Sequence, residues 1–279
     1  MNWKSVLSKD GTVKYLFTTS DKQNIESVFI PQKTTSTICL SSQVGCALAC
    51  TFCATGALGF TRNLSHEEII EQYETIMKDQ NIKELPNIVF MGMGEPLLNL
   101  PSVKKAVDFF HNKIHLSKKK ITISTVGITP QFPAVAQLGT QFALSLHAPS
   151  DALREKIMPI NKKYKISKIF NALSVFQFTK HKPLMIEYIL LNEVNDQEEH
   201  IKQLITLLKK YQYPYLINII PYNAHLFSSY TKSSRAEKCK QQLIQAGFKT
   251  FIRESRGQDI NAACGMLTGL TQIKKLNNP

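Results

Sequence analysis

Apolar segments typical of buried strands alternate with helical patterns over most of this chain. The predicted strands, several with the continuous apolar runs expected of strands covered on both faces, are STICLSS, NIVFMGM, KITISTVG, QFALSLHA, PLMIEYILL, YLINIIPY and FKTFIRES. The clearest amphipathic helices are predicted at residues 65–79, 102–112, 167–179, 196–211 and 234–246. Ser65 and Glu68, three residues apart, are the signature of a helix N-terminus.

This alternation specifies parallel strands joined by right-handed crossovers. With 279 residues the chain is long enough for one large core and a single barrel. We therefore predict an α/β fold, a closed or partly closed TIM-like barrel over residues 36–270. Segments 11–19 and 25–31, with SDKQN as their turn, predict an antiparallel pair within an N-terminal β extension over residues 1–35. Residues 271–279 are expected to form a tail.

Polar motifs fall at or just after the ends of the predicted strands. They are the cysteine-rich loop, GMGEP, the region of Ser124, SLH and PYN. In a parallel barrel, the carboxyl ends of the strands form the catalytic face. The five segments are therefore expected to converge at one mouth.

Cys46, Cys50 and Cys53 lie within the eight residues GCALACTFC. A protein-held 4Fe-4S cluster normally takes four thiolates, and structural zinc takes four ligands. The nearest further candidates, Cys39 and His66, do not have ordinary ligand spacing. We predict an iron-sulfur cluster with one iron left without a protein ligand, where chemistry would occur. Zinc completed by a distant ligand and plain core cysteines are the alternatives.

The cysteine motif, C-x3-C-x2-C with an aromatic residue before the last cysteine, resembles the signature of radical S-adenosylmethionine (SAM) enzymes. From about residue 11 to residue 270 the chain closely resembles the RlmN branch of the RlmN/Cfr RNA methyltransferases. The resemblance implies a partial (β/α)6 radical SAM barrel with a 4Fe-4S cluster and SAM as cofactors. The strings that carry it are CLSSQVGCALACTFCATGALGFTRNL, MGMGEPLLN, ISTVGITP, LSLHAP, MPINKKY, IIPYN and RGQDINAACG.

The resemblance also implies which residues hold the cofactors. Cys46, Cys50 and Cys53 would bind the cluster. Glycine allows close backbone approach, a carboxylate pairs with the amino group of SAM, and Ser and Asn suit its ribose and carboxylate. The implied SAM contacts are Gly94, Glu95, Ser124, Ser145, Leu146, His147 and Asn223.

Three further residues complete the implied chemistry. On their own, Cys264 and Cys39 would be typical small buried hydrophobes, and Glu26 an exposed strand glutamate. By resemblance, one SAM methylates Cys264, and a 5'-deoxyadenosyl radical from a second SAM takes hydrogen from that methyl group. The resulting methylene radical adds to carbon 2 of adenine, Glu26 accepts the ring proton, and Cys39 releases the product through a transient disulfide. The α-carbons of the two cysteines must be able to approach within roughly 7 Å.

Charge and targeting features limit which partners and which compartment are expected. The formal net charge of +13 favours a polyanion such as RNA, although a generally basic surface has the same composition. The N-terminus lacks the apolar core of a signal peptide, and no segment is apolar for the ~18 residues of a membrane span. We expect a cytoplasmic protein without a membrane partner. Its six cysteines favour a metal or redox role over a disulfide framework.

The resemblance implies ribosomal or transfer RNA as substrate and an electron donor such as flavodoxin or ferredoxin. GMGEPL is closer to the carbon 2 branch than to the carbon 8 branch. Family members usually carry a helical N-terminal domain that helps to engage RNA, whereas 25 residues precede Glu26, so a short form is expected.

Two other functions stay open at this point. A radical SAM enzyme with a non-RNA substrate would not require Cys39 and Cys264. A non-catalytic, zinc-containing RNA-binding protein would require a fourth zinc ligand.

Overall fold

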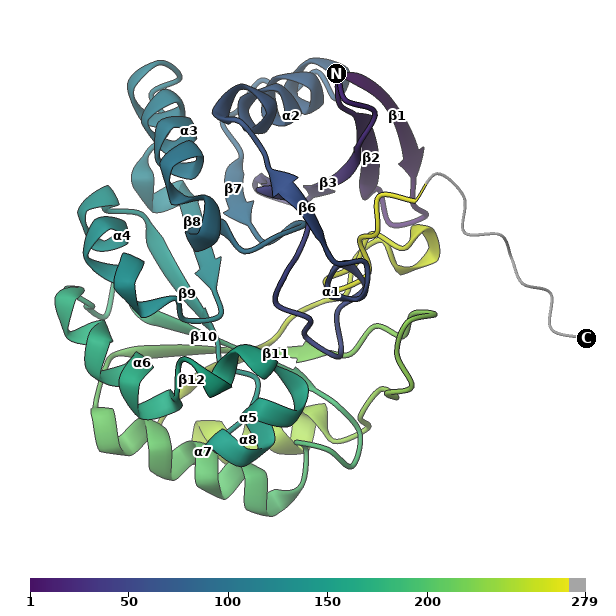
Figure 1. Cartoon of the computed structure of the whole chain (residues 1–279). Coiled ribbons are helices and arrows are strands. Elements are labelled where there is room, and N and C mark those ends of the chain that lie inside the picture. The colour runs from purple at the N-terminus through teal and green to yellow at the C-terminus, as the bar shows by residue number, and fades with distance from the viewer. Residues whose placement is uncertain (271–279) are drawn as a thin grey trace, which may run out of the picture.

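A curved mixed sheet organises the computed structural model, which describes residues 1–270 (Figure 1). Its strands and those of a small separate hairpin are β1 (Asn2–Leu7), β2 (Val13–Thr18), β3 (Asn24–Pro31), β4 (Ser36–Cys39), β5 (Gln43–Gly45), β6 (Phe60–Asn63), β7 (Asn87–Phe90), β8 (Ile121–Thr125), β9 (Gln141–Ser145), β10 (Leu184–Leu190), β11 (Tyr215–Pro221) and β12 (Lys249–Ile252). The large sheet has the order β1-β2-β3-β4-β7-β8-β9-β10-β11-β12, and β5 pairs with β6.

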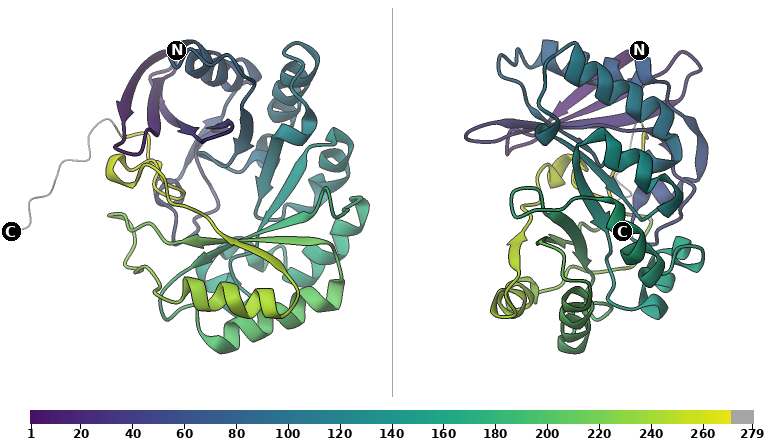
Figure 2. Two further views of the ribbon diagram at one scale, coloured as in Figure 1. Left: turned by 180° about the vertical axis from the view of Figure 1, so that it is seen from behind. Right: turned by 90° about the vertical axis from the view of Figure 1, so that its left-hand side faces the viewer.

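Most helices cover the outer face of this sheet (Figures 1 and 2). The helices are α1 (Ala54–Ala57), α2 (His66–Asp79), α3 (Leu100–Asn112), α4 (Phe132–Leu138), α5 (Asp151–Ile157), α6 (Ile166–Ala172), α7 (Glu198–Tyr211) and α8 (Ala236–Gln245). Of these, α1 and α5 lie in loops at the barrel mouth. None of the helices in residues 1–270 is both long and apolar enough to cross a membrane.

The parallel part of the large sheet confirms the predicted (β/α)6 barrel. It consists of β4, β7, β8, β9, β10, β11 and β12, and each strand pairs in parallel with the next one in this order. Six strand-helix units follow one another, β4-α2, β7-α3, β8-α4, β9-α6, β10-α7 and β11-α8, before the last strand β12. Since β1 and β12 are the two edges of the described sheet, the barrel is partial.

The N-terminal extension is an antiparallel meander continuous with the barrel sheet. β2 and β3 form the predicted pair, and β3 also pairs antiparallel with β4. β1 was not predicted, because all six of its residues are exposed and NWKSVL has no alternating pattern. The domain boundary at residue 35 stays a prediction, and the predicted tail over residues 271–279 lies outside the described residues.

One predicted helix is too long. Helix α2 has the predicted capping box of Ser65 and Glu68, but the helix predicted over 167–179 ends at Ala172 and is followed by one 3-10 turn. Phe176 packs against Phe142 of β9, with ring centroids 4.4 Å apart. Burial of this aromatic side chain against the sheet takes the chain out of the helical path, so tertiary packing overrides local propensity here.

The segment after β12 returns across the barrel to the N-terminal strands (Figure 2). Asp10 in the β1-β2 turn accepts a hydrogen bond of 2.8 Å from the backbone of Gly257. Farther along, Glu26 of β3 accepts one of 2.7 Å from the backbone of Thr268. These anchors on both sides of Cys264 carry that residue over the centre of the barrel.

Candidate active site

Two cavities meet inside the barrel. The small cavity, of 160 Å³, lies between the cysteine loop, the loop after β7 and the ends of β8 and β9. The large cavity, of 420 Å³, lies between β3, β4, β11 and the segment after β12. Both are lined by Cys53, Met91, Glu187, Arg253 and Cys264, so these residues form the wall where the cavities join.

Cys46, Cys50 and Cys53 all line the small cavity from the loop between β5 and α1. The β5-β6 hairpin holds this loop, and the backbone of Cys46 donates a hydrogen bond of 2.7 Å to the carbonyl of Gly59. Burial raises the pKa of the Cys46 thiol to about 12, and the charge of neighbouring Cys53 raises it further. The three cysteines thus share one space, as the ligands of one cluster must.

The other two candidate ligands lie elsewhere. Cys39 lines the large cavity, and His66 lies in a separate surface hollow between α2 and α3. Within residues 1–270, no group of three His, Cys, Asp or Glu side chains is placed so that it could hold a single metal ion. Three thiolates, each on a different iron, are what a 4Fe-4S cluster with one open iron takes from the protein, and these cysteines fit that group.

Gly94 and Glu95 form the turn after β7. Gly94 has φ +96, and a Cβ there would lie 2.5 Å from Cβ of Gln43, so only glycine fits. The Glu95 carboxylate lines the small cavity and accepts hydrogen bonds from the backbones of Leu97 and Val126, at 3.1 and 3.0 Å. A buried, hydrogen-bonded carboxylate suits the amino group of SAM.

Burial raises the pKa of Glu95 to about 7, against the lowering effect of its hydrogen bonds. Its pKa in the unfolded chain lies near 4.5, so between these values the folded state holds a proton that the unfolded state lacks. Raising the pH from 5 to 8 should therefore destabilise the cofactor-free protein relative to Glu95→Gln, by up to about 1.4 kcal/mol per pH unit in that window. Urea unfolding of both proteins at the two pH values measures this, and parallel pH profiles would contradict it.

Three more predicted SAM contacts line the small cavity. Ser124 and Ser145, at the ends of β8 and β9, have hydroxyl oxygens 3.4 Å apart. His147 accepts a hydrogen bond of 3.0 Å on Nδ1 from the backbone of Ile189, and burial lowers its pKa to about 3. The ring is therefore neutral, and its other nitrogen bears the proton. These groups join Glu95 around one space.

Leu146 and Asn223 are placed differently. The side chain of Leu146 is fully buried and lines neither cavity, while its backbone donates to the carbonyl of Glu187 at 3.1 Å. Asn223 lines the large cavity and donates a hydrogen bond of 3.2 Å to the carbonyl of Cys264. Their roles as SAM contacts stay predictions.

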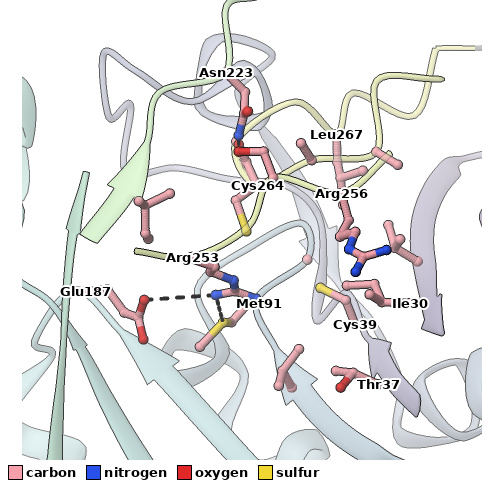
Figure 3. Close-up of a pocket in the computed structure, with 18 of the residues that line it drawn as sticks. Ile30, Thr37, Cys39, Met91, Glu187, Asn223, Arg253, Arg256, Cys264 and Leu267 are labelled. Atoms are coloured by element: carbon pink, nitrogen blue, oxygen red, sulfur yellow. Dashed lines mark hydrogen bonds and ion pairs between the residues drawn. The ribbon is translucent and has the colours of Figure 1, made fainter. Parts of the chain in front are cut away.

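Cys39 and Cys264 point into the large cavity from two different segments (Figure 3). Neither forms a disulfide. Burial raises the pKa of Cys39 to about 12, and the nearby Cys264 raises it further. The two thiols thus share one space, as the predicted exchange between them requires, and their closer approach stays a prediction.

Glu26 lies outside the lining of both cavities. Its carboxylate is 1% exposed, pairs with Nζ of Lys14 at 2.9 Å, and accepts hydrogen bonds from the backbones of Thr268 and Gly269. In this conformation it anchors the segment that follows Cys264. Its predicted role as proton acceptor therefore stays a prediction, and requires the 268–269 segment to move.

Arg154 was missed by the sequence analysis. It is fully buried in α5, and its guanidinium donates to the carbonyls of Val126, Ser145 and Leu146 at 2.6, 3.0 and 3.0 Å. These carbonyls lie at the carboxyl ends of β8 and β9. Arg154 therefore fixes the strand ends that carry Ser124, Ser145 and His147.

Replacing Arg154 by Met should cost at least about 3 kcal/mol of folding free energy, since several buried carbonyls lose their donors. Arg62→Met is the matched control, because Arg62 is partly exposed and its ion pairs are with surface carboxylates. Urea unfolding measures both. An Arg154 variant as stable as the Arg62 variant would contradict this role.

Glu187 and Arg253 were also missed. Glu187 is the one charged residue of the predicted strand PLMIEYILL, and that contrast was the available signal. Arg253 gave no such signal, because FKTFIRES also holds Lys249 and Glu254. Oε1 of Glu187 accepts a hydrogen bond of 2.8 Å from Asn218, and Oε2 lies 3.9 Å from Nη1 of Arg253. Nη1 also lies 3.2 Å from the sulfur of Met91 (Figure 3).

Comparison with known proteins identifies the family to which the chain is similar. Residues 40–205 match the model of the Radical SAM superfamily. A dual-specificity RNA methyltransferase RlmN from Wigglesworthia glossinidia brevipalpis is 46% identical, over 97% of this chain and 74% of that protein. Another, from Vesicomyosocius okutanii, is 42% identical, over 98% of this chain and 80% of that protein.

Solved structures agree on the fold. A radical SAM methyltransferase from Sphaerobacter thermophilus superposes with a TM-score of 0.90 and 35% identity, covering 96% of this chain and 80% of that one. The hydrogenase maturase HydG from Carboxydothermus hydrogenoformans, at 16% identity and a TM-score of 0.58, shares the fold alone. The similarity to RlmN proteins covers nearly all of this chain and includes the cysteine loop. The chain therefore belongs to the RlmN family of radical SAM RNA methyltransferases.

Proposed function

We propose that this enzyme methylates carbon 2 of an adenine in ribosomal or transfer RNA, with Cys264 as the methyl carrier. The observation that carries the proposal is the position of Cys264 in the wall between the two cavities. On one side lie the three cysteines and Glu95. On the other lies Cys39, in a space large enough for a small ligand, for which roughly 300–1,000 Å³ is usual.

The small cavity supports binding of both cofactors. Cys46, Cys50 and Cys53 would hold a 4Fe-4S cluster, and Glu95, with Ser124, Ser145 and His147, would hold SAM in the same cavity. When bound, the cluster supplies the electron that cleaves SAM to a 5'-deoxyadenosyl radical. A flavodoxin or ferredoxin would supply that electron. The relatives' names, which specify RNA methyltransferases of dual specificity, support RNA as substrate.

The large cavity supports the remaining steps. Cys264 would present its methylated sulfur to an adenine held there. After the carbon-carbon bond has formed and the ring proton has left, one electron would return from the adduct to the oxidised cluster. The Cys39 thiolate would then attack the Cys264 sulfur, so that a disulfide forms as the carbon-sulfur bond breaks and the released carbon takes up a proton. The external reductant would return the disulfide to two thiols. Glu26 would accept the ring proton once the segment that it anchors has moved. The net charge of +13 would attract the RNA backbone.

The proposal is tested with the reconstituted enzyme, dithionite, total cellular RNA and SAM that carries a CD3 group. A methyl group carried on Cys264 loses one deuterium to 5'-deoxyadenosine and regains hydrogen on release, so we expect 2-methyladenosine with CD2H by mass spectrometry. Direct transfer from SAM would leave CD3 intact and would contradict the proposal. Methylation at carbon 8 would correct the assigned position. Formation of 5'-deoxyadenosine without methylated RNA would point to a non-RNA substrate.

A further inference from the structure

The wall shared by the two cavities holds a hydrogen-bond acceptor, Glu187, beside a donor, Arg253. The proposed chemistry uses neither residue. Glu187 is 3% exposed, and within residues 1–270 no group donates a hydrogen bond to its Oε2. Its other oxygen is held by Asn218, which fixes the direction of the carboxylate. Oε2 is therefore a buried acceptor without a hydrogen-bond donor, on a carboxylate that lines both cavities.

Arg253 supplies the donor. Its Nη1 lies 3.9 Å from Oε2 of Glu187, too far for a hydrogen bond between them. Within the described residues, the Arg253 guanidinium donates its hydrogen bond to the thioether of Met91. A thioether is a weak acceptor. The side chain is 27% exposed and lines both cavities, so several N–H groups stay free for a ligand.

The order of these groups matches one edge of adenine. Figure 3 shows the Arg253 guanidinium between the carboxylate of Glu187 and the sulfur of Cys264. The Watson–Crick edge of adenine presents, in order, the N6 amino donor, the N1 acceptor and carbon 2. An adenine that donates to Glu187 and accepts from Arg253 would therefore turn carbon 2 toward Cys264.

We propose that Glu187 and Arg253 read the Watson–Crick edge of the target adenine in the large cavity and thereby select both the base and the carbon that is methylated. This inference rests on the proposed function and names how its base is chosen. Guanine would set its O6 against the Glu187 carboxylate and its N1–H against Arg253, so both contacts would become repulsive. Such mismatched polar pairs in a buried site give strong discrimination.

Other parts of the large cavity fit a nucleobase that has left its stack. Val28, Ile30, Val89 and Leu267 supply apolar walls for the faces of the ring. Arg256, at the rim, is 30% exposed and pairs with the exposed Glu254 at 2.8 Å, and a flanking phosphate would compete with that carboxylate for it. These contacts would offset part of the cost of unstacking the base.

The test measures binding of five-nucleotide RNAs, UUXUU, by fluorescence anisotropy to the protein without its cofactors. X is adenine, guanine or purine, which lacks the amino group, and salt is kept at physiological strength to weaken phosphate contacts. We expect adenine to bind about tenfold more tightly than the other two, the lower range for a bidentate contact. Equal binding of the three RNAs by the unmodified protein would overturn the inference.

Two variants locate the preference. In Glu187→Gln, either orientation of the amide puts an N–H group against the adenine amino group or against Asn218, so the adenine preference should fall to about twofold or less. In Arg253→Lys, which keeps the charge but loses the fork, the adenine preference should fall similarly. Glu254→Gln is the matched control, because Glu254 lines the same cavity at its exposed rim and pairs there with Arg256. Its replacement frees Arg256 and should raise the affinity for all three RNAs while the adenine preference stays unchanged.

An adenine preference that persists in both variants would overturn the inference. The test is separate from catalysis, since no cofactor is present. A preference lost in the variants, together with reconstituted enzyme that methylates no RNA, would support the inference and contradict the proposed function.

Discussion

Cys264→Ala should abolish RNA methylation entirely, because the proposed methyl carrier is lost and carbon 2 of adenine offers no nucleophile for direct transfer from SAM. Formation of 5'-deoxyadenosine should persist, since it needs the cluster site and SAM, and neither loses a ligand. Mass spectrometry of RNA nucleosides and of 5'-deoxyadenosine in the same reaction measures both results. Peptide mapping of the enzyme without substitutions should show a methyl group on Cys264.

Cys239→Ala is the matched control for this experiment. Cys239 is a buried cysteine in α8 that lines neither cavity, so its replacement makes the same chemical change away from the site. It should methylate RNA at the rate of the unmodified enzyme. If Cys264→Ala methylated RNA to a normal level, Cys264 would not be the methyl carrier. The group from which the 5'-deoxyadenosyl radical takes hydrogen would then have to be another one.

Cys39→Ala should stop the enzyme after a single turnover with RNA covalently attached. Without the Cys39 thiol, nothing breaks the bond between the Cys264 sulfur and the new carbon on adenine. The two cysteines face one cavity, so removal of one leaves the other free to react but not to release its product. We expect release of methylated RNA to fall below one equivalent per enzyme.

Nuclease digestion followed by peptide mass spectrometry should find an adenosine joined through a methylene group to Cys264 in this variant. Cys239→Ala again serves as control and should give no adduct. Continued release of free 2-methyladenosine by Cys39→Ala, well beyond one equivalent, would show that another group resolves the intermediate.

Local patterns in the sequence determined the barrel and the cysteine loop. Strand and helix periodicity reports burial of one face of a local segment, and it predicted the seven parallel strands and five of the six helices that follow them. The short helix α4, with seven residues, was missed, and the count of six units came from the family resemblance. The cysteine spacing is likewise local, within eight residues. The exposed strand β1 and the short β5-β6 hairpin were missed, because both are held by pairing with a partner strand rather than by a pattern of their own.

Roles that came only from the family resemblance had mixed structural outcomes. Glu95, Ser124, Ser145 and His147 do lie around one cavity, because the ends of parallel strands meet at one edge. Glu26, by contrast, is engaged with Lys14 and the backbone near Thr268. No local signal in NIESVFIP distinguishes a carboxylate that faces substrate from one that anchors a distant segment.

Tertiary structure alone decided the composition of the shared wall. Glu187 and Arg253 are 66 positions apart, and they meet because β10, β11 and β12 pair in parallel with Glu187 opposite Asn218. Sheet register, which depends on long-range packing, sets which strand residues are neighbours. The sequence by itself therefore determined the fold and the predicted cysteine ligands, whereas the order of Glu187, Arg253 and Cys264 along one cavity arose only when distant strands came together.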